Sequence, residues 1–526
     1  MRFRYDKESE EIVVTSSTRI EYHQLDLWLT RHVKGYRFMP AFKMGVWNGK
    51  QSYFNSGRIN LGLWKECLRG CQEIGASFIL DNKEDFPLNR NVSLESVRDF
   101  CNDFFKDHKV KNKSGEWVPF FPYDHQVESA FKILKNRYCL SEVATSGGKT
   151  LIISIVYFYT IRNIDPTAKL LIIVPSITLV TQFYDSIVDF NIGLNKEFDG
   201  GNKNPIDLKI EEIMSDRPRK HGTEEDPNVC IGTYQSLEKW PKEFFKKFHT
   251  IAVDESHGAK SKTLISILKK TMKSAYSRFG VSGTFPSDDS CEILTIQSVL
   301  GPKITEVSAH ELKEKGIISP VEIKALILNH NDLDYLSRLE IIKKSGMGKE
   351  ALELEKDFIH NSKKRIDLIC KIVEKCDKNT LVLFHTIEYG QKLYSHLSAN
   401  LKDKDFFYID GEVRNKSREE IKSFMEDTSG NPKILIASFG TLSTGVSITS
   451  IFNVIFADSF KSEQIIIQSI GRALRLHEDK KTAIIFDLVD IFDSGNMKNI
   501  LFNHFKEREK FYLKRKYPYK ISKINL

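Results

Sequence analysis

The chain has 526 residues, of which 41% are hydrophobic and 28% charged, and a formal net charge of +8, values typical of an ordinary globular protein. Its length predicts three or four domains. The segment after Met1 is charged from Arg2 onward and lacks an apolar core, which excludes a signal peptide, and the longest apolar run, 151–161, is too short to span a bilayer. The eight cysteines are scattered without a C-x-x-C pair, so we expect reduced thiols in a cytoplasmic compartment.

Residues 1–90 predict a small α+β domain with a helical segment at Arg19–Val33 and another from Leu61. The interval Arg31–Arg69 contains eight basic residues and one acid, interleaved with aromatic rings. Cations neutralise phosphates and rings stack on bases, which favours nucleic-acid binding. Alternatively, the rings form the core of the domain and the charges a solvated face. A tight turn at Asn48-Gly49 is expected to present its neighbours at a tip. The candidate contacts are Arg37, Lys43, Trp47 and Lys50.

Residues 91–118 predict one helix, Leu94–Phe105, followed by a linker rich in Lys and Gly at 109–115. From Pro119 the pattern becomes strand, loop and helix in repetition, which predicts a parallel sheet flanked by helices over 119–317. Within this domain, 191–228 is polar and without clear period, and we expect a loop-rich insertion there.

The segment 142–150, E-V-A-T-S-G-G-K-T, is a candidate phosphate-binding loop. Its glycines let backbone N–H groups turn toward an anion, Lys149 would reach the β- and γ-phosphates, and the Thr150 hydroxyl would hold Mg²⁺. Because Val143 replaces the first glycine of the usual motif, a glycine-softened strand-to-helix turn is the alternative. Upstream, Gln126 could read an adenine edge or begin a helix. The nucleotide-binding candidates here are Gln126, Thr145, Ser146, Gly147, Gly148, Lys149 and Thr150.

The sequence I-A-V-D-E-S-H places Asp254 and Glu255 directly after an apolar strand. Phosphoryl transfer needs a carboxylate for Mg²⁺ and a second group that orients the attacking water, so we assign the metal to Asp254, with Thr150, and the water to Glu255. Other strands of this domain end in hydroxyl and amide residues, and ligands bind at such ends in parallel sheets. These supply candidate contacts to a nucleic-acid strand, namely Thr178, Gln182, Thr233 and Thr284.

A second α/β domain is predicted at 318–503, without a phosphate loop of its own. Near its end, Q-S-I-G-R-A-L-R places Arg472 and Arg475 three residues apart, on one face of a helix. Such a pair is either a solvated face or an arginine finger for a γ-phosphate. The remaining 504–526 carries eight basic residues and two acids, which predicts a basic tail, either a capping helix or an additional DNA clamp.

Taken together, these segments resemble the superfamily 2 helicases of the DExH type. The matching motifs, in order, are A-T-S-G-G-K-T, P-S-I-T-L-V-T-Q, D-E-S-H, S-G-T, S-F-G-T-L-S-T-G-V-S and Q-S-I-G-R-A-L-R. The amino-terminal Y-R-F-M-P-A-F-K-M-G-V-W-N-G-K is similar to the head of the UvsW-type recombination helicases of T-even-like phages, and this likeness runs along the whole chain. Ser447 departs from the pattern, since many superfamily members carry Asp there.

The resemblance implies two RecA-like parallel-sheet domains in tandem with a small α+β amino-terminal domain. It implies ATP and Mg²⁺ as cofactors and an ATP-driven helicase that unwinds or remodels branched DNA in phage recombination, repair and replication. It adds Gly445 and Gln468 to the nucleotide site and Ser438 to the strand contacts. The expected partners are single-stranded and branched DNA in the host cytoplasm, with RNA–DNA hybrids and phage recombination or single-strand-binding proteins as further candidates. The alternatives are a double-strand translocase, an RNA helicase and a binding protein with a vestigial ATPase.

Overall fold

The computed structural model describes residues 1–86, 90–111, 116–193, 202, 204–215, 226–271, 275–344, 348–411, 415–440, 448–462, 465–466, 469–471, 480, 482–492 and 499–526. The chain divides into two compact units, the first made of Met1–Ala144 and Gly148–Val307, the second of Thr145–Gly147 and Ser308–Leu526. Across the described ranges, no helix combines the length and the apolar character needed to cross a membrane.

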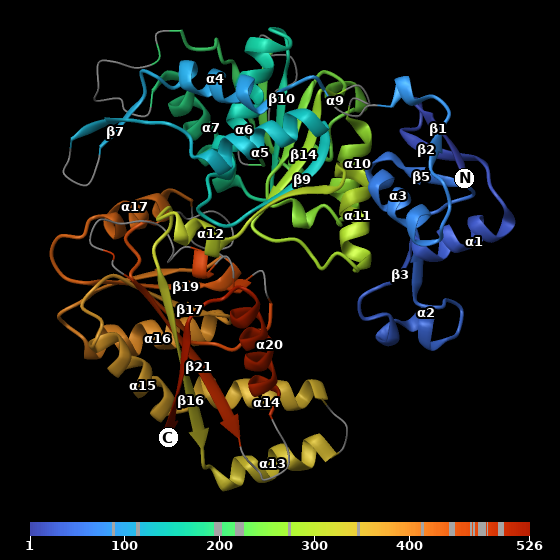
Figure 1. The fold of residues 1–526 in the computed structure, drawn as a ribbon. Coiled ribbons are helices and arrows are strands. Elements are labelled where there is room, and N and C mark those ends of the chain that lie inside the picture. The colour runs from blue at the N-terminus through green and yellow to red at the C-terminus, as the bar shows by residue number, and fades with distance from the viewer. Residues whose placement is uncertain are drawn as a thin grey trace. The chain divides into compact units, whose positions relative to one another are not determined.

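The first unit begins with a small module whose four-stranded sheet has the order β5-β2-β1-β6 (Figure 1). Helix α1 starts at a capping box, because the Thr18 hydroxyl accepts from the Glu21 N–H at 3.1 Å and the Glu21 carboxylate accepts from the Thr18 N–H at 2.8 Å. The elements of the module body are β1 (Arg2–Asp6), β2 (Glu11–Ser16), α1 (Arg19–Trp28), β5 (Arg58–Asn60), η2 (Leu61–Leu63), α3 (Trp64–Glu73), β6 (Ile79–Leu80) and η3 (Lys83–Asp85).

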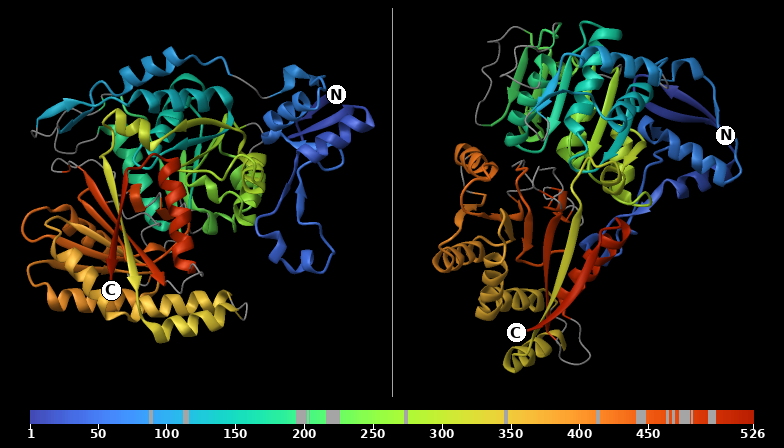
Figure 2. Two further views of the ribbon diagram at one scale, coloured as in Figure 1. Left: turned by 60° about the horizontal axis from the view of Figure 1, so that its bottom comes forward. Right: turned by 60° about the vertical axis from the view of Figure 1, so that its left-hand side comes forward.

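An arm, residues 30–52, extends from this module (Figures 1 and 2). Its base is the antiparallel pair β3 (Thr30–His32) and β4 (Lys50–Ser52), and it carries η1 (Tyr36–Phe38) and α2 (Pro40–Lys43). Helix α1 therefore ends before the predicted Val33, because the chain turns into β3. The prediction that Asn48-Gly49 forms the tip is also wrong. Gly49 lies at the base, where its carbonyl accepts from the Val33 N–H at 2.9 Å and the chain enters β4.

The module shares a hydrophobic core with the α/β part of the first unit. The Tyr53 hydroxyl donates to the Cys291 carbonyl at 2.7 Å, and the Glu10 carboxylate pairs with Arg278 at 3.0 Å, both of them in buried surroundings. At Gly62 the backbone approaches helix α11 (Cys291–Leu300) so closely that an added Cβ would lie 2.0 Å from the Gln297 carbonyl oxygen. The module is therefore a built-in part of the first unit.

The remainder of the first unit is a seven-stranded parallel sheet in the order β11-β12-β10-β13-β14-β9-β15, with helices on both faces (Figure 1). Its strands are β9 (Tyr138–Val143), β10 (Leu170–Val174), β11 (Ile210–Ile213), β12 (Val229–Thr233), β13 (Thr250–Val253), β14 (Ser277–Ser282) and β15 (Lys303–Val307). Its principal helices, besides α11, are α4 (Leu94–Phe104), α5 (Asp124–Asn136), α6 (Lys149–Asn163), α7 (Ile177–Ile192), α8 (Tyr234–Leu237), α9 (Lys242–Phe245) and α10 (Lys262–Lys270).

Two segments predicted as irregular contain strands. The insertion 191–228 holds β11, which pairs with β12 as an edge strand, and the linker begins with β7 (Lys109–Lys111), which pairs with β8 (Trp117–Pro119). Both strands are short, and β11 alternates buried and half-buried residues within a polar context. Hydrophobic periodicity over so few residues is too weak to predict a strand that only its neighbour stabilises.

The second unit is also built on a seven-stranded parallel sheet, in the order β18-β19-β17-β20-β21-β16-β22. The strands are β16 (Val321–His330), β17 (Thr380–Phe384), β18 (Asp405–Ile409), β19 (Lys433–Ser438), β20 (Asn453–Phe456), β21 (Ala483–Phe492) and β22 (Tyr519–Asn525). The helices are α12 (Ala309–Glu314), α13 (Leu333–Lys344), α14 (Gly348–Asn361), α15 (Lys363–Glu374), α16 (Ile387–Asn400), α17 (Asn415–Glu426) and α20 (Ile500–Lys514).

The carboxyl-terminal segment, which the sequence predicts to be a basic tail, is part of this domain. Helix α20 buries Phe505, Phe511 and Tyr512, and β22 adds a strand beside β16. The net charge of 504–526 does not reveal this packing, because one of its basic residues, Arg508, is itself buried and the others are interspersed with residues that pack.

Two buried ion pairs join β21 to neighbouring helices. The Arg508 guanidinium of α20 donates bidentate hydrogen bonds to the Asp487 carboxylate, at 2.8 and 3.0 Å. The Tyr512 hydroxyl donates to the same carboxylate at 2.8 Å. Arg365 of α15 grips Asp490 in the same way, at 2.8 and 3.0 Å. Burial by itself would raise the pKa of Asp490, but Arg365 and His330 outweigh it and hold that pKa at about 2.

We expect Arg508→Met to lower the free energy of unfolding by about 3–5 kcal/mol, because it leaves the Asp487 carboxylate buried without its cation. Lys510→Ala is the matched control on the same helix, since Lys510 is exposed and pairs with exposed Glu507. The control should change stability by no more than about 0.5 kcal/mol. Urea unfolding of the full chain measures both variants, and equal effects would contradict a structural role for the buried pair.

Candidate nucleotide site and nucleic-acid surface

The phosphate-loop candidate joins the end of β9 to the start of α6. Gly148 is the N-cap of α6 in a left-handed conformation, with φ of 83°, and Ser146 has a positive φ of 69°. An L-residue rarely adopts that conformation, so the loop is held in an unusual shape at Ser146. Lys149 and Thr150 follow as the first residues of the helix, whose backbone N–H groups and positive end face the loop.

Asp254 and Glu255 follow β13 at the same edge of the sheet as this loop, because all seven strands are parallel. The Lys149 ammonium lies 3.5 Å from the Glu255 carboxylate. Glu255 itself has a positive φ of 47°, a second strained position at this edge. The structure thus brings together the lysine and the two acids that the sequence selected from segments a hundred residues apart.

The two carboxylates have opposite electrostatic environments. Burial, followed by the charge of Glu255, raises the pKa of Asp254. Burial would raise the pKa of Glu255 as well, but Lys149 and His257 outweigh it and lower that pKa. Among the described residues, the Asp254 Oδ1 atom is buried without a hydrogen-bond partner. An unsatisfied carboxylate oxygen beside an ionised acid is a suitable ligand for a divalent cation.

His257 and Ser282 connect this acid to the next strand, a role that sequence reasoning missed. His257 Nδ1 lies 3.2 Å from the Glu255 carboxylate and 2.9 Å from the Ser282 hydroxyl, which lies 2.9 Å from the Thr284 carbonyl. The signal was present in the final position of D-E-S-H and in S-G-T, but only the order of β13 and β14 shows that these two motifs touch.

Gln126 lies beside the phosphate loop. An added Cβ at Gly148 would lie 2.1 Å from Gln126 Nε2, so a glycine is required there by close approach as well as by φ. The Gln126 Oε1 atom accepts from the Tyr123 N–H at 2.9 Å at the start of α5. Gln126 therefore caps the start of α5, as one alternative predicts, and it borders the loop, whereas its reading of an adenine edge stays a prediction.

The residues that are predicted to contact a nucleic-acid strand differ in accessibility. Thr178 and Gln182 are half-buried and share one face of α7, four residues apart. Thr233 is buried, and its hydroxyl accepts from the Ser236 N–H at 3.3 Å as the N-cap of α8, so the hydroxyl is already used. Thr284, two residues after β14, and Ser438, the last residue of β19, are half-buried.

On the arm, Arg37, Lys43 and Lys50 are exposed. Trp47 is half-buried, and its indole N–H donates to the Lys50 carbonyl at 2.8 Å, so its ring stiffens the arm instead of standing at a tip. The candidates Gly445, Gln468, Arg472 and Arg475 lie outside the described residues.

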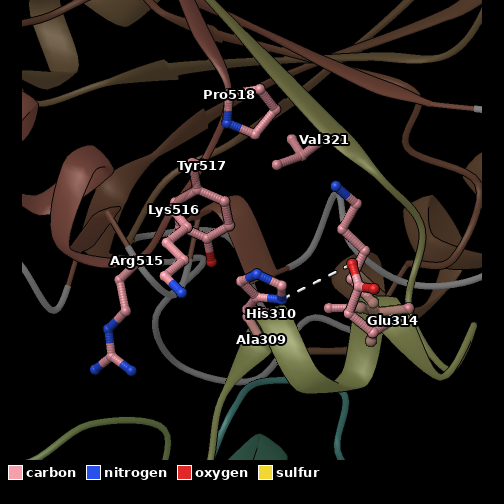
Figure 3. A pocket seen from close by; sticks show the side chains of 10 residues that line it. Ala309, His310, Glu314, Val321, Arg515, Lys516, Tyr517 and Pro518 are labelled. Atoms are coloured by element: carbon pink, nitrogen blue, oxygen red, sulfur yellow. Dashed lines mark ion pairs between the residues drawn. The ribbon is translucent and has the colours of Figure 1, made fainter.

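The second unit has a pocket of about 70 Å³ between α12 and the turn from α20 to β22 (Figure 3). His310, Lys313, Arg515 and Lys516 are among its lining side chains, and His310 pairs with Glu314 at 3.9 Å. The basic segment at the carboxyl end therefore contributes two cations, Arg515 and Lys516, to a concave surface as well as a strand to the sheet.

Comparison with known proteins identifies the motor. Residues 123–293 match the DEAD/DEAH box helicase family, and residues 364–477 match the helicase conserved C-terminal domain. The chain therefore carries a DEAD/DEAH box helicase domain followed by a helicase conserved C-terminal domain. It is an ATP-dependent helicase, and the prediction of two RecA-like domains with a small α+β amino-terminal region is confirmed.

Similarity to relatives extends beyond the two matched domains. The chain is 29% identical to the ATP-dependent DNA helicase uvsW of Enterobacteria phage T4, over 96% of each chain. It is 22% identical to putative helicase 22 of a Sulfolobus islandicus filamentous virus, over 90% of this chain and 81% of the relative. The solved structure of S. cerevisiae Dbp5 bound to RNA and ADP BeF3 shares the fold, with a TM-score of 0.51 and 16% identity over 77% of this chain and 90% of that one.

Lys149→Ala should weaken ATP binding, whereas Glu255→Gln should bind ATP and hydrolyse it at least about a hundredfold more slowly. The predicted role of Lys149 is to touch phosphate in the ground state, whereas that of Glu255 is to act on the attacking water. The matched control is Glu306→Gln, an exposed acid on β15 of the same sheet. Nucleotide affinity and steady-state turnover separate the roles, and near-normal turnover of Glu255→Gln would exclude its assignment.

Proposed function

We propose that this helicase acts on DNA and unwinds or remodels branched substrates, namely forks, Holliday junctions and R-loops, in phage recombination, repair and replication. The observation that carries the proposal is the basic arm on a module anchored in the first motor domain. The relative in phage T4 supports it, because that protein is named a DNA helicase and its similarity includes nearly all of this chain. The site of action is the host cytoplasm, with recombination or single-strand-binding proteins as candidate partners.

The arm supplies a second nucleic-acid contact, which a two-domain motor lacks. A motor that grips the backbone of one strand obtains little information about the shape of a junction. Arg37, Lys43 and Lys50 are exposed on a segment whose base is fixed by β3–β4 pairing and by the neighbouring Tyr53 contact to α11. A second contact of this kind selects a branch point.

In the nucleotide site, Lys149 binds the phosphates, and Thr150 and Asp254 hold Mg²⁺. The unsatisfied Asp254 Oδ1 atom fits a cation there. When bound, the ion neutralises charge on the phosphates. Glu255 orients the attacking water and stays ionised because Lys149 and His257 lower its pKa. Arg472 and Arg475 complete the site as the stabilisers of transition-state charge.

Arg475→Ala should leave ATP affinity largely intact and reduce hydrolysis by a factor of about 10³, because an arginine finger acts on charge that develops in the transition state. Arg475→Lys is the matched variant, since it keeps the charge but not the planar fork. ATP turnover at saturating nucleotide measures both. If the Arg475→Ala variant hydrolyses ATP at the normal rate, Arg475 belongs to a solvated helix face and has no part in hydrolysis.

Replacing Arg37, Lys43 and Lys50 together by Glu should weaken binding to forked and four-way DNA. It should also flatten the dependence of log K on log salt by about 0.9 for each phosphate that the variant no longer neutralises. ATPase stimulated by plain single strands should survive, because the motor keeps its own contacts. The measurement is salt-dependent binding, with unwinding of a fork, a four-way junction and an RNA–DNA hybrid by wild type and variant in parallel.

Equal weakening on plain single strands and on junctions would make the arm a general clamp or a folding element. A wild-type protein that separates no strands on any substrate is a double-strand translocase. Unwinding of RNA duplexes in preference to DNA would reveal an RNA helicase.

A further inference from the structure

The arm displays large apolar side chains to solvent. Phe38 is 81% exposed, Val46 73% and Met44 69%. All three lie within 38–46, the part of the arm farthest along the chain from its β3–β4 base. Single exposed apolar residues are ordinary on protein surfaces, but three on so short a segment mark an interaction site.

This exposure is not the result of a loose loop, because the arm has a small core of its own. The Tyr36 ring stacks on His32 at 4.4 Å between centroids and meets Phe42 edge-on at 4.8 Å. Gly49 makes room for that ring, since a Cβ there would lie 2.1 Å from it. Trp47 closes the base through its bond to the Lys50 carbonyl. The arm thus buries Tyr36 and Phe42 in part and leaves Phe38, Met44 and Val46 outside.

The charge around these side chains indicates their partner. Between Arg31 and Lys50 the chain carries five basic residues and no acid. Phosphates complement such a surface, whereas a second copy of the same arm would repel it. Nucleic-acid-binding proteins combine cations for the backbone with apolar or aromatic side chains that stack on bases or wedge between them.

We propose that Phe38, supported by Met44 and Val46, stacks on the terminal or unpaired base at the branch point of the nucleic acid. This inference rests on the proposed function and specifies what the arm recognises. The basic residues hold the flanking phosphates. The apolar tip, formed by Phe38, Met44 and Val46, contacts a base face that an intact duplex conceals. Because Tyr53 ties the arm base to α11, the tip is a fixed wedge against which the motor draws the strand.

The test compares Phe38→Ala, Phe38→Trp and the matched control Ile20→Ala in the full-length protein. Ile20 is 72% exposed on α1 of the same module but outside the arm. The probe is a forked DNA with 2-aminopurine at the branch, beside a plain duplex and a plain single strand. Stacking on one base corresponds to about 5- to 150-fold in affinity. Phe38→Ala should bind the fork alone more weakly by that factor, with an unchanged salt slope and unchanged ATPase on single strands.

Wild type and Phe38→Trp should quench the 2-aminopurine fluorescence, whereas Phe38→Ala should not. Normal fork binding and quenching by Phe38→Ala would overturn the inference and leave the proposed function standing. Failure of the wild type to prefer forks would overturn both. Self-association of the wild type that Phe38→Ala abolishes would also overturn the inference, because the tip would then be an interface between copies.

Discussion

The parallel arrangement of the first sheet is the constraint on which the nucleotide site depends. Parallel strands end at one edge, so the loop after β9, the acids after β13 and the hydroxyl at the end of β14 meet although they are far apart in the chain. The strand order then sets the finer contacts. Because β14 lies between β13 and β9, Ser282 stands next to the acids and meets His257 and Glu255. The resulting network links Glu255 to the S-G-T segment.

The second sheet depends on a different interaction. Its strand β21 carries Asp487 and Asp490 in the fully buried interior, each gripped by one arginine from a flanking helix. Such pairs need not add net stability over apolar packing, but removing one partner is costly. They also fix position, because a guanidinium meets a carboxylate in one planar geometry. Arg508 thereby positions α20, and the chain that follows α20 returns as β22, so an apparently solvated basic tail is bound into the domain.

The amino-terminal module joins a rigid base to an exposed tip. Its body shares a core with the first motor domain, whereas the arm uses its larger rings to hold its own shape. Those two roles require different residues, and they separate clearly. Tyr36 and Phe42 stabilise the arm, Tyr53 anchors it, and Phe38 with its apolar neighbours stays exposed. Some rings of this stretch therefore pack inside the module, as one alternative predicts, and nucleic-acid contact by its charges stays a prediction.

The sequence by itself determined the features that depend on local chemistry and chain order. The glycines before Lys149, the acids after an apolar strand and the order of the motifs identified a tandem α/β helicase and its nucleotide-site candidates. Tertiary structure decided what depends on neighbours distant in the chain. Only strand pairing made 210–213 and 519–525 into sheet, because short polar segments become strands when a neighbour satisfies their backbone groups. Only packing showed that Thr233 caps a helix, that His257 touches Ser282 and that Gly49 lies beneath the Tyr36 ring. These are contacts between side chains and backbone brought together by the fold, and no local pattern of residue types encodes them.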